Sequence, residues 1–206
     1  MNKYLTELVG TFFLVLTIGM SANPIAIGSI LMVMVYMGGN ISGAHYNPAV
    51  TLAILIRGKI NAKDASIYMV FQIIGATIAS FIIQRHFGTI GFPMPSLGVS
   101  FIGAVFYEIA FTFALALVVL NVATTKKAAG NSYYGLAIGF TVLAGAYSVG
   151  SLSGGAFNPA VALGPMIADL FGTRQLLSNT AIYILGPFVG ASIAAFFFKF
   201  QNPDEE

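Results

Sequence analysis

The sequence predicts an all-α membrane protein with six transmembrane helices plus two re-entrant half-helices in an inverted repeat. Three observations lead to this prediction. The composition is too apolar for a water-soluble domain, because 57% of the 206 residues are hydrophobic and 8% are charged, against about 25% charged in soluble domains. Apolar segments recur along the whole chain. The tetrapeptide Asn-Pro-Ala-Val occurs twice, at 47–50 and at 158–161.

Six apolar segments are long enough to cross a bilayer, which takes about 20 mostly apolar helical residues. The predicted spans are Lys3–Met20, Pro24–Gly39, Asp64–Phe87, Val99–Val122, Asn131–Val149 and Ser178–Phe200. The second is short, but Ser21–Asn23 leaves little loop before it, so neighbouring helix ends can be shared. The first segment is interpreted as a span and not as a signal peptide, because similar apolar segments follow to the end of the sequence.

Two further apolar pieces, Asn47–Ile56 and Asn158–Ala168, are too short to span. Ten helical residues cover roughly 15 Å, about half of a 30 Å hydrocarbon core. Asn is a preferred N-cap, and Pro suits the first helical position, where no N–H is needed. Each Asn-Pro pair is therefore expected to start a half-helix that enters the bilayer and stops. The stretches before them, Ser42–Tyr46 and Ser153–Phe157, are expected to be extended or turning backbone.

The basic residues indicate an orientation. With six spans and a cytoplasmic N-terminus, the inner side receives seven Lys and Arg residues and the outer side two. The inner set is Lys3, Arg57, Lys59, Lys63, Lys126, Lys127 and Lys199, and the outer set is Arg85 and Arg174. This positive-inside bias predicts a multi-pass protein of the cell (plasma or inner) membrane with both termini in the cytoplasm. The acidic tail at 203–206 is expected to be a solvated end without a special role.

The single channel domain, 1–206, is expected to consist of two repeats at about 1–98 and 99–206. Ala26–Val50 and Ala137–Val161 align without a gap at an offset of 111 residues, with 11 identities in 25 positions. Each half contains three spans, an odd number, so the second copy must be inverted in the membrane. Inverted repeats place a functional site at the midplane, lined by broken helices.

Two half-helices in an inverted repeat bring their N-termini together near the midplane. Each N-terminus carries about +0.5 of an elementary charge, so together they repel cations. The amides of Asn47 and Asn158 are expected to donate hydrogen bonds into the space between them. Irregular backbone at this depth must line a cavity or be buried in protein. The carbonyls expected to accept hydrogen bonds there belong to Gly43, Ala44, His45, Gly154, Gly155 and Ala156.

The stretches SGAHYNPAVT at 42–51 and GGAFNPAVALGP at 154–165 resemble the aquaporin and aquaglyceroporin (major intrinsic protein) family. So do GTFF at 10–13, GPFVG at 186–190 and the acids Glu7 and Glu108. The resemblance covers nearly the whole chain. It implies six tilted helices and two half-helices around one pore per subunit, in a homotetramer. The pore motifs that it implies are Asn47, Pro48, Ala49, Asn158, Pro159 and Ala160.

In that family, acids at the positions of Glu7 and Glu108 brace the half-helix loops by accepting backbone N–H bonds. The residues alone favour the same role, because an acid inside a membrane needs a partner and unpaired loop N–H groups need acceptors. A proton-relay role is the alternative. His45 matches the family's loop histidine, and a pore-facing or loop-fixing role is favoured over a pH gate.

The resemblance also implies an outer constriction with four contributors, usually including an aromatic residue and an Arg after the second Asn-Pro-Ala. Ungapped spacing assigns Ile27, Ala146, Gly155 and Val161 to it. Val161 stands where the Arg is expected, and Ala162 replaces the acid that follows it in glycerol-type members. A ring with little bulk and no side-chain donor is expected to admit solutes larger than water. Alternatively, another residue fills the gap, or the loop His86–Leu97 folds over it.

The predicted function is a passive transmembrane channel for water or small neutral solutes. A facilitator of glycerol, urea or ammonia with little water preference is the alternative. An ion-coupled secondary transporter is a weaker one, although it can share inverted repeats and broken helices. An enzyme is not expected, because no nucleophile–base set or nucleotide loop is visible. No cofactor, metal or nucleic-acid partner is expected either, since cysteine is absent, the two histidines are far apart, and Lys126-Lys127 is the largest basic cluster.

Overall fold

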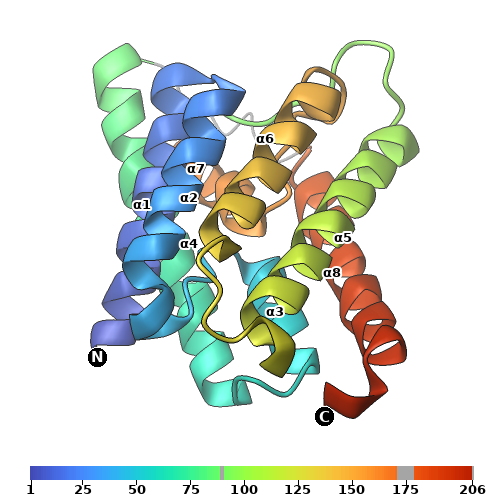
Figure 1. Cartoon of the computed structure of the whole chain (residues 1–206). Helices are drawn as coiled ribbons and strands as arrows, with labels where there is room; N and C mark the ends of the chain where they lie inside the picture. Colours follow the sequence, from blue (N-terminus) through green and yellow to red (C-terminus); the bar gives the residue numbers. More distant parts are fainter. Residues whose placement is uncertain (89–90, 171–178, 206) are drawn as a thin grey trace.

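The computed structural model describes residues 1–88, 91–170 and 179–205. Six α-helices in this part of the chain are long and apolar enough to cross a membrane, which confirms the predicted spans. They are α1 (Asn2–Ser21), α2 (Pro24–Ser42), α4 (Ala62–Phe87), α5 (Phe101–Thr124), α6 (Tyr134–Ser153) and α8 (Thr180–Gln201), with two short 3₁₀ turns, η1 (Lys126–Ala128) and η3 (Pro203–Glu205). Both termini lie at the same end of the bundle (Figure 1). The predicted helix start at Ser178 and the outer Arg174 lie outside the described residues.

Helices α2 and α6 both continue past their predicted ends at Gly39 and Val149. Each ends one residue before a glycine in the left-handed conformation, Gly43 with φ 86° and Gly154 with φ 97°. Glycine adopts this conformation without a steric penalty from Cβ, which is why it ends helices well. The extra turn brings the end of each helix directly to the loop that precedes a half-helix.

The two half-helices are α3 (Pro48–Ile56), of 9 residues, and α7 (Pro159–Asp169), of 11 residues. Both lie inside the ring of long helices, α3 in the half of the bundle that holds the termini and α7 in the opposite half (Figure 1). Asn47 and Asn158 are the N-caps of these helices and not their first helical residues. The predicted half-helices are therefore present, with Asn as the N-cap and Pro as the first helical residue, as the sequence predicts.

Glycines allow the helices to pack backbone to backbone, and these contacts repeat in the two halves. A Cβ built on Gly75 of α4 would lie 2.3 Å from a backbone oxygen of α1, and one on Gly190 of α8 would lie 2.4 Å from a backbone oxygen of α5. Between the halves, a Cβ on Gly28 of α2 would lie 2.7 Å from the carbonyl oxygen of Gly139 in α6. Gly28 and Gly139 are equivalent in the sequence repeat, so the halves meet there through matching surfaces. The boundary of the repeats near residue 98 stays a prediction.

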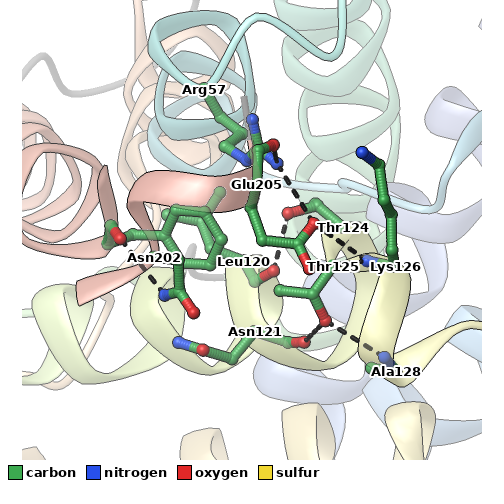
Figure 2. A network of polar contacts seen from close by, with 10 residues as sticks. Arg57, Leu120, Asn121, Thr124, Thr125, Lys126, Ala128, Asn202 and Glu205 are labelled. Carbon is green, nitrogen blue, oxygen red and sulfur yellow. Dashed lines mark hydrogen bonds and ion pairs between the residues drawn. The ribbon is translucent and has the colours of Figure 1, made fainter. Parts of the chain in front are cut away.

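Glu205 in the C-terminal tail is docked and not solvated, which corrects the expectation for this residue, whereas Pro203 and Asp204 are exposed. The Glu205 side chain is buried, and its carboxylate accepts the amide N–H of Lys126 at 2.9 Å (Figure 2). The backbone carbonyl of Glu205 accepts a hydrogen bond from Arg57 Nη2, which lies 3.8 Å from the Glu205 carboxylate. The guanidinium of Arg57 also lies 5.0 Å from the centroid of the Phe198 ring. These contacts join the end of α3, the turn η1 and the tail.

We expect the docking of this tail to depend on pH. The amide N–H of Lys126, with help from Lys127 and Arg57, holds the pKa of Glu205 below its usual range. That range is centred at about 4.3 in an unfolded chain. A carboxylate whose pKa is depressed by folding stabilises the folded form above its unfolded pKa, and this contribution is lost as the pH falls through the folded pKa. The tail should therefore stay docked at neutral pH and be released below about pH 4.

A spin label can measure this release, because the chain contains no cysteine that would compete for labelling. A label on Asp204→Cys, at an exposed position next to Glu205, should be immobilised at neutral pH and become mobile in acid. The control adds Glu205→Gln, which cannot ionise, so its label mobility should not change with pH. The same acid transition in the Glu205→Gln protein would show that another group controls the tail.

Candidate functional site

Each half-helix begins at an Asn-Pro pair with the same geometry. Asn47 has extended backbone (φ −157°, ψ 120°), and its Oδ1 accepts the N–H of Ala49 at 2.8 Å. Asn158 has φ −155° and ψ 113°, and its Oδ1 accepts the N–H of Ala160 at 3.0 Å. Both side-chain oxygens are thus used as N-caps. Only the NH₂ groups remain to face the opposite half.

Those NH₂ groups link the two halves. Asn47 Nδ2 donates to the carbonyl oxygen of Phe157 at 2.8 Å, and Asn158 Nδ2 donates to the carbonyl oxygen of Tyr46 at 2.9 Å. Both amides were expected to donate into the space between the half-helices, and one hydrogen of each is engaged in this reciprocal bond. An amide NH₂ carries two hydrogens, so one donor per asparagine remains. The midplane therefore has two donors held in fixed positions by the opposite loop.

Glu7 of α1 is fully buried beneath the loop that precedes α3. Its Oε2 accepts the N–H of Tyr46 at 2.7 Å, and its Oε1 accepts the N–H of His45 at 3.0 Å. The Ser42 hydroxyl donates to the same Oε1 at 2.6 Å, and Gln72 Nε2 donates to Oε2 at 2.7 Å. This carboxylate is an acceptor for four donors and fixes the loop to α1.

Glu108 of α5 occupies the matching place in the second half and is also fully buried. Its Oε2 accepts the N–H of Phe157 at 2.7 Å, and its Oε1 accepts the N–H of Ala156 at 3.1 Å. The Ser153 hydroxyl donates to Oε1 at 2.8 Å. The two acids that the sequence singled out thus make the same three contacts, each with the loop of its own half.

The loops carry the same backbone pattern in both halves. Positive φ angles occur at Gly43, Ala44 and Tyr46 and, 111 residues later, at Gly154, Gly155 and Phe157. Tyr46 at φ 51° and Phe157 at φ 48° are bulky residues in the left-handed region, and such a conformation costs about 1–3 kcal/mol. The N–H groups of these two residues are the ones that bind the carboxylates at 2.7 Å. The buried acids therefore hold the strained points of the loops.

Four further residues complete this bracing, and none of them was predicted from the sequence as a site residue. They are the serines that bind the carboxylates, Ser42 and Ser153, and the tyrosines Tyr68 and Tyr183. The Tyr68 hydroxyl donates to the carbonyl of Ser42 at 2.8 Å, and the Tyr183 hydroxyl donates to the carbonyl of Ser153 at 2.5 Å. These residues could have been predicted from the repeat, because each serine and each tyrosine occurs at equivalent positions of the two halves. Polar side chains present in both copies are candidates for the same contact in each.

One polar cluster of the first half has no counterpart at the matching positions of the second half. The Thr51 hydroxyl donates to the carbonyl of Asn47 at 3.0 Å and accepts from Gln72 Nε2 at 3.0 Å. Because a hydroxyl has one hydrogen, the 3.1 Å contact between Thr51 Oγ1 and His45 Nδ1 requires that Nδ1 donates. His45 Nε2 is then left as an acceptor. The matching positions in the second half are Ala156, Ala162 and Pro187.

A cavity of about 560 Å³, termed the outer cavity, runs from the end opposite the termini to the asparagine amides. Its wall includes Ala22 and Pro24 at the α1–α2 junction and both asparagines of the motif. Among the described residues that line it, none is charged. The four positions assigned to a constriction by spacing all belong to its wall: Ile27, Ala146, Gly155 and Val161.

A second cavity of about 530 Å³, termed the inner cavity, lies at the end that holds the termini. Its wall includes three charged residues, Lys59 and the ion pair of Lys3 with Asp64, whose Nζ and Oδ2 are 2.8 Å apart. His45 lines both cavities. Of the loop residues expected along a pore, Gly43 lines the inner cavity, while Ala44, Gly154, Gly155 and Ala156 line the outer one.

Comparison with known proteins agrees with this arrangement. The sequence model of the major intrinsic protein family matches residues 1–198. The chain belongs to the major intrinsic protein family. It is 40% identical to glycerol uptake facilitator protein-like 6 of Lactiplantibacillus plantarum, over 95% of this chain and 96% of that protein. It is 30% identical to aquaporin AqpM of Methanothermobacter thermautotrophicus, over 98% of each chain.

Among solved structures, the aquaglyceroporin from Plasmodium falciparum has the same fold, with a TM-score of 0.87 over 99% of this chain and 98% of the other. At 22% sequence identity, this structural similarity supports the fold only. Major intrinsic proteins are membrane channels for water or glycerol-type small solutes. With its six apolar helices, this member is an integral, multi-pass membrane protein, and the family resemblance read from its motifs is confirmed.

Proposed function

We propose that this protein is a passive channel whose path runs through the outer cavity, past Asn47 and Asn158, and out through the inner cavity. One observation carries the proposal: two half-helix N-termini meet at the end of a cavity that no charged residue of the described chain lines. At each N-terminus, the asparagine has one amide hydrogen that is not engaged in the bond to the opposite loop. Fixed donors at one point, followed by loop carbonyls on either side, suit a neutral molecule that both donates and accepts. Water, glycerol, urea and ammonia have this chemistry.

Exclusion of ions rests on the midplane in this proposal. The two helix N-termini together present about one positive charge to the path, which repels cations. A water held by two asparagine donors points its hydrogens away from the centre in both directions, and this orientation interrupts a chain of proton transfer. Among the described residues, the outer cavity has no charged lining residue and therefore adds no electrostatic barrier to cations.

The outer constriction is proposed to consist of Ile27, Ala146, Gly155 and Val161. These side chains provide no hydrogen-bond donor and no charge. Water that passes them loses hydrogen bonds to the wall, whereas a solute with carbon–hydrogen surface does not. A facilitator of glycerol-type solutes with little water preference is therefore the second candidate, and the name of the 40% identical relative from Lactiplantibacillus plantarum points the same way.

An ion-coupled transporter is disfavoured by the way the acids are used. Coupling requires a titratable group that faces the path. Glu7 and Glu108 each accept two backbone N–H bonds and a serine hydroxyl bond, which makes them bracing residues in our proposal. Neither acid lines the outer or the inner cavity. Two titratable groups that do line the cavities, Asp64 and His45, are bound by Lys3 and by Thr51, respectively.

The proposed setting is the cell (plasma or inner) membrane, with both termini in the cytoplasm and four copies of the chain in a homotetramer. The excess of Lys and Arg at the end that holds the termini supports the orientation. The tetramer rests on family resemblance. Chemical crosslinking in native membranes would test it, and a species no larger than a monomer would remove this part of the proposal.

Transport in liposomes tests the function itself. Purified protein is reconstituted, and light scattering follows shrinkage under an osmotic step and re-swelling as glycerol or urea enters. We expect water and glycerol permeabilities above those of protein-free vesicles, with no requirement for a proton or sodium gradient. Permeabilities equal to the protein-free control would overturn the channel proposal. Flux that appears only with an ion gradient would favour a coupled transporter.

A further inference from the structure

The segment between α4 and α5 crosses the end of the bundle opposite the termini (Figure 1). From residue 91 onward it is described, and Ser96 attaches it to the end of α6. The Ser96 amide donates to the carbonyl of Leu152 at 3.0 Å, and the Ser96 hydroxyl donates to the carbonyl of Ser151. Carbonyl groups in the last turn of a helix have no partner within the helix. Ser96 satisfies two of them and thereby fixes the position of the segment.

The same segment packs directly on the loop before α7. A Cβ built on Gly154 would lie 2.7 Å from the amide nitrogen of Met94 and 3.0 Å from the carbonyl carbon of Pro93. Backbone meets backbone at this point, so there is no room for the segment to shift toward the loop. Residues 91–93 consequently become part of the wall of the outer cavity.

Phe92 is the bulky residue of this stretch. It lines the outer cavity together with Val161, and it packs against the buried cluster that contains Val161 and Tyr183. The centroids of the Phe92 and Tyr183 rings are 5.8 Å apart with an interplanar angle of 81°, an edge-to-face contact. Tyr183 is itself held by its hydroxyl bond to Ser153. The ring of Phe92 is therefore supported by the same braced framework that positions the second Asn-Pro-Ala motif.

We propose that Phe92 is a fifth residue of the outer constriction and that it sets the upper size of the solutes that pass. The four positions assigned by spacing carry small or aliphatic side chains, and Phe92 supplies from a loop the aromatic bulk that they lack. An aromatic face offers apolar contact to the carbon–hydrogen edge of a solute, while its width limits the cross-section. The solutes expected to pass are small, unbranched and neutral, such as water and glycerol, and longer polyols are expected to be held back.

This inference rests on the proposed channel function and deepens it. The experiment compares Phe92→Ala, Phe92→Trp and Leu97→Ala with the wild type in liposomes. Leu97 lies on the same segment with its side chain fully exposed, and it does not line the outer cavity, so it serves as the matched control. For each protein, erythritol, glycerol and water permeabilities are measured on one vesicle preparation and expressed as ratios to water. A loss of folded protein lowers all three fluxes together and leaves the ratios unchanged.

Phe92→Ala should raise the erythritol-to-water ratio by about tenfold, since a change in the size of an apolar pocket shifts discrimination by roughly that factor or more. Phe92→Trp, which keeps the aromatic contact with Tyr183 and adds bulk, should lower the glycerol-to-water ratio. Leu97→Ala should leave both ratios as in the wild type. Unchanged ratios in both Phe92 variants would overturn the assignment, even if their total flux fell. Wild-type fluxes no higher than in protein-free vesicles would instead overturn the proposed function, and the assignment of Phe92 with it.

Discussion

Glu7→Ala is expected to abolish water flux and to destabilise the folded protein. The substitution leaves the N–H groups of His45 and Tyr46 without an acceptor in a fully buried place. Each unpaired buried donor costs about 1–3 kcal/mol. Tyr46 also loses the bond that holds its left-handed backbone, at φ 51°. Because Asn158 donates to the carbonyl of Tyr46, the disturbance should reach the opposite half-helix. The thermal unfolding midpoint in detergent and the osmotic water permeability in liposomes measure the two effects.

Glu7→Gln separates bracing from proton transfer. Glutamine keeps one acceptor oxygen for the loop but cannot ionise. Within the described residues, Gln72 Oε1 is buried without a hydrogen-bond partner, so rotation of the Gln72 amide would give the new NH₂ group an acceptor. We therefore expect partial stability and measurable water flux in Glu7→Gln. A well-folded Glu7→Gln protein without any flux would contradict the bracing role and favour a proton relay.

The long helices and the half-helices were predictable because their causes are local. Hydropathy over about 20 residues identifies a span, and an Asn-Pro pair specifies an N-cap and a first helical residue wherever it occurs. The helix ends were less accurate. Gly39 and Gly150 resemble helix breakers in the sequence, but the helices continue through both and end about one turn later, before Gly43 and Gly154 in the left-handed conformation.

The contacts that could not be predicted join residues far apart in the chain. Arg57 and Glu205 are separated by 148 positions, and nothing in either segment indicates the other. Gln72 lies within an apolar span and looks like an isolated polar residue until α4 is packed against α1 and α3. Phe92 lies in a loop whose path depends on the free carbonyls at the end of α6. In each case the packing of the helices, and not the local sequence, determines which residue is the contact partner.

Val161→Arg is expected to convert the outer cavity into a narrower, charged path. Val161 is 3% exposed and lies in the first turn of α7, where its side chain contributes to the wall. Among the described residues of that wall no acid is present to neutralise a new cation. The longer side chain should fill space that glycerol needs, while water can still pass and accept its hydrogen bonds. We expect glycerol permeability to fall by about tenfold, equivalent to about 1.4 kcal/mol of added barrier, and water permeability to fall less.

Val161→Met distinguishes the effect of a longer side chain from the effect of an added positive charge. Methionine adds length without charge and adapts its shape readily, so it should lower glycerol permeability while leaving the leak of potassium ions unchanged. Val161→Arg should lower glycerol permeability and, where the wild type leaks potassium past the midplane, that leak as well, because a fixed positive charge in an uncharged cavity repels cations before they reach the midplane. Equal losses of water and glycerol permeability in Val161→Arg would count against the placement of Val161 in the constriction. If instead potassium leak is undetectable in the wild type as well as in both variants, the two half-helix N-termini suffice to exclude cations, and the role of Val161 is confined to the size of the solute.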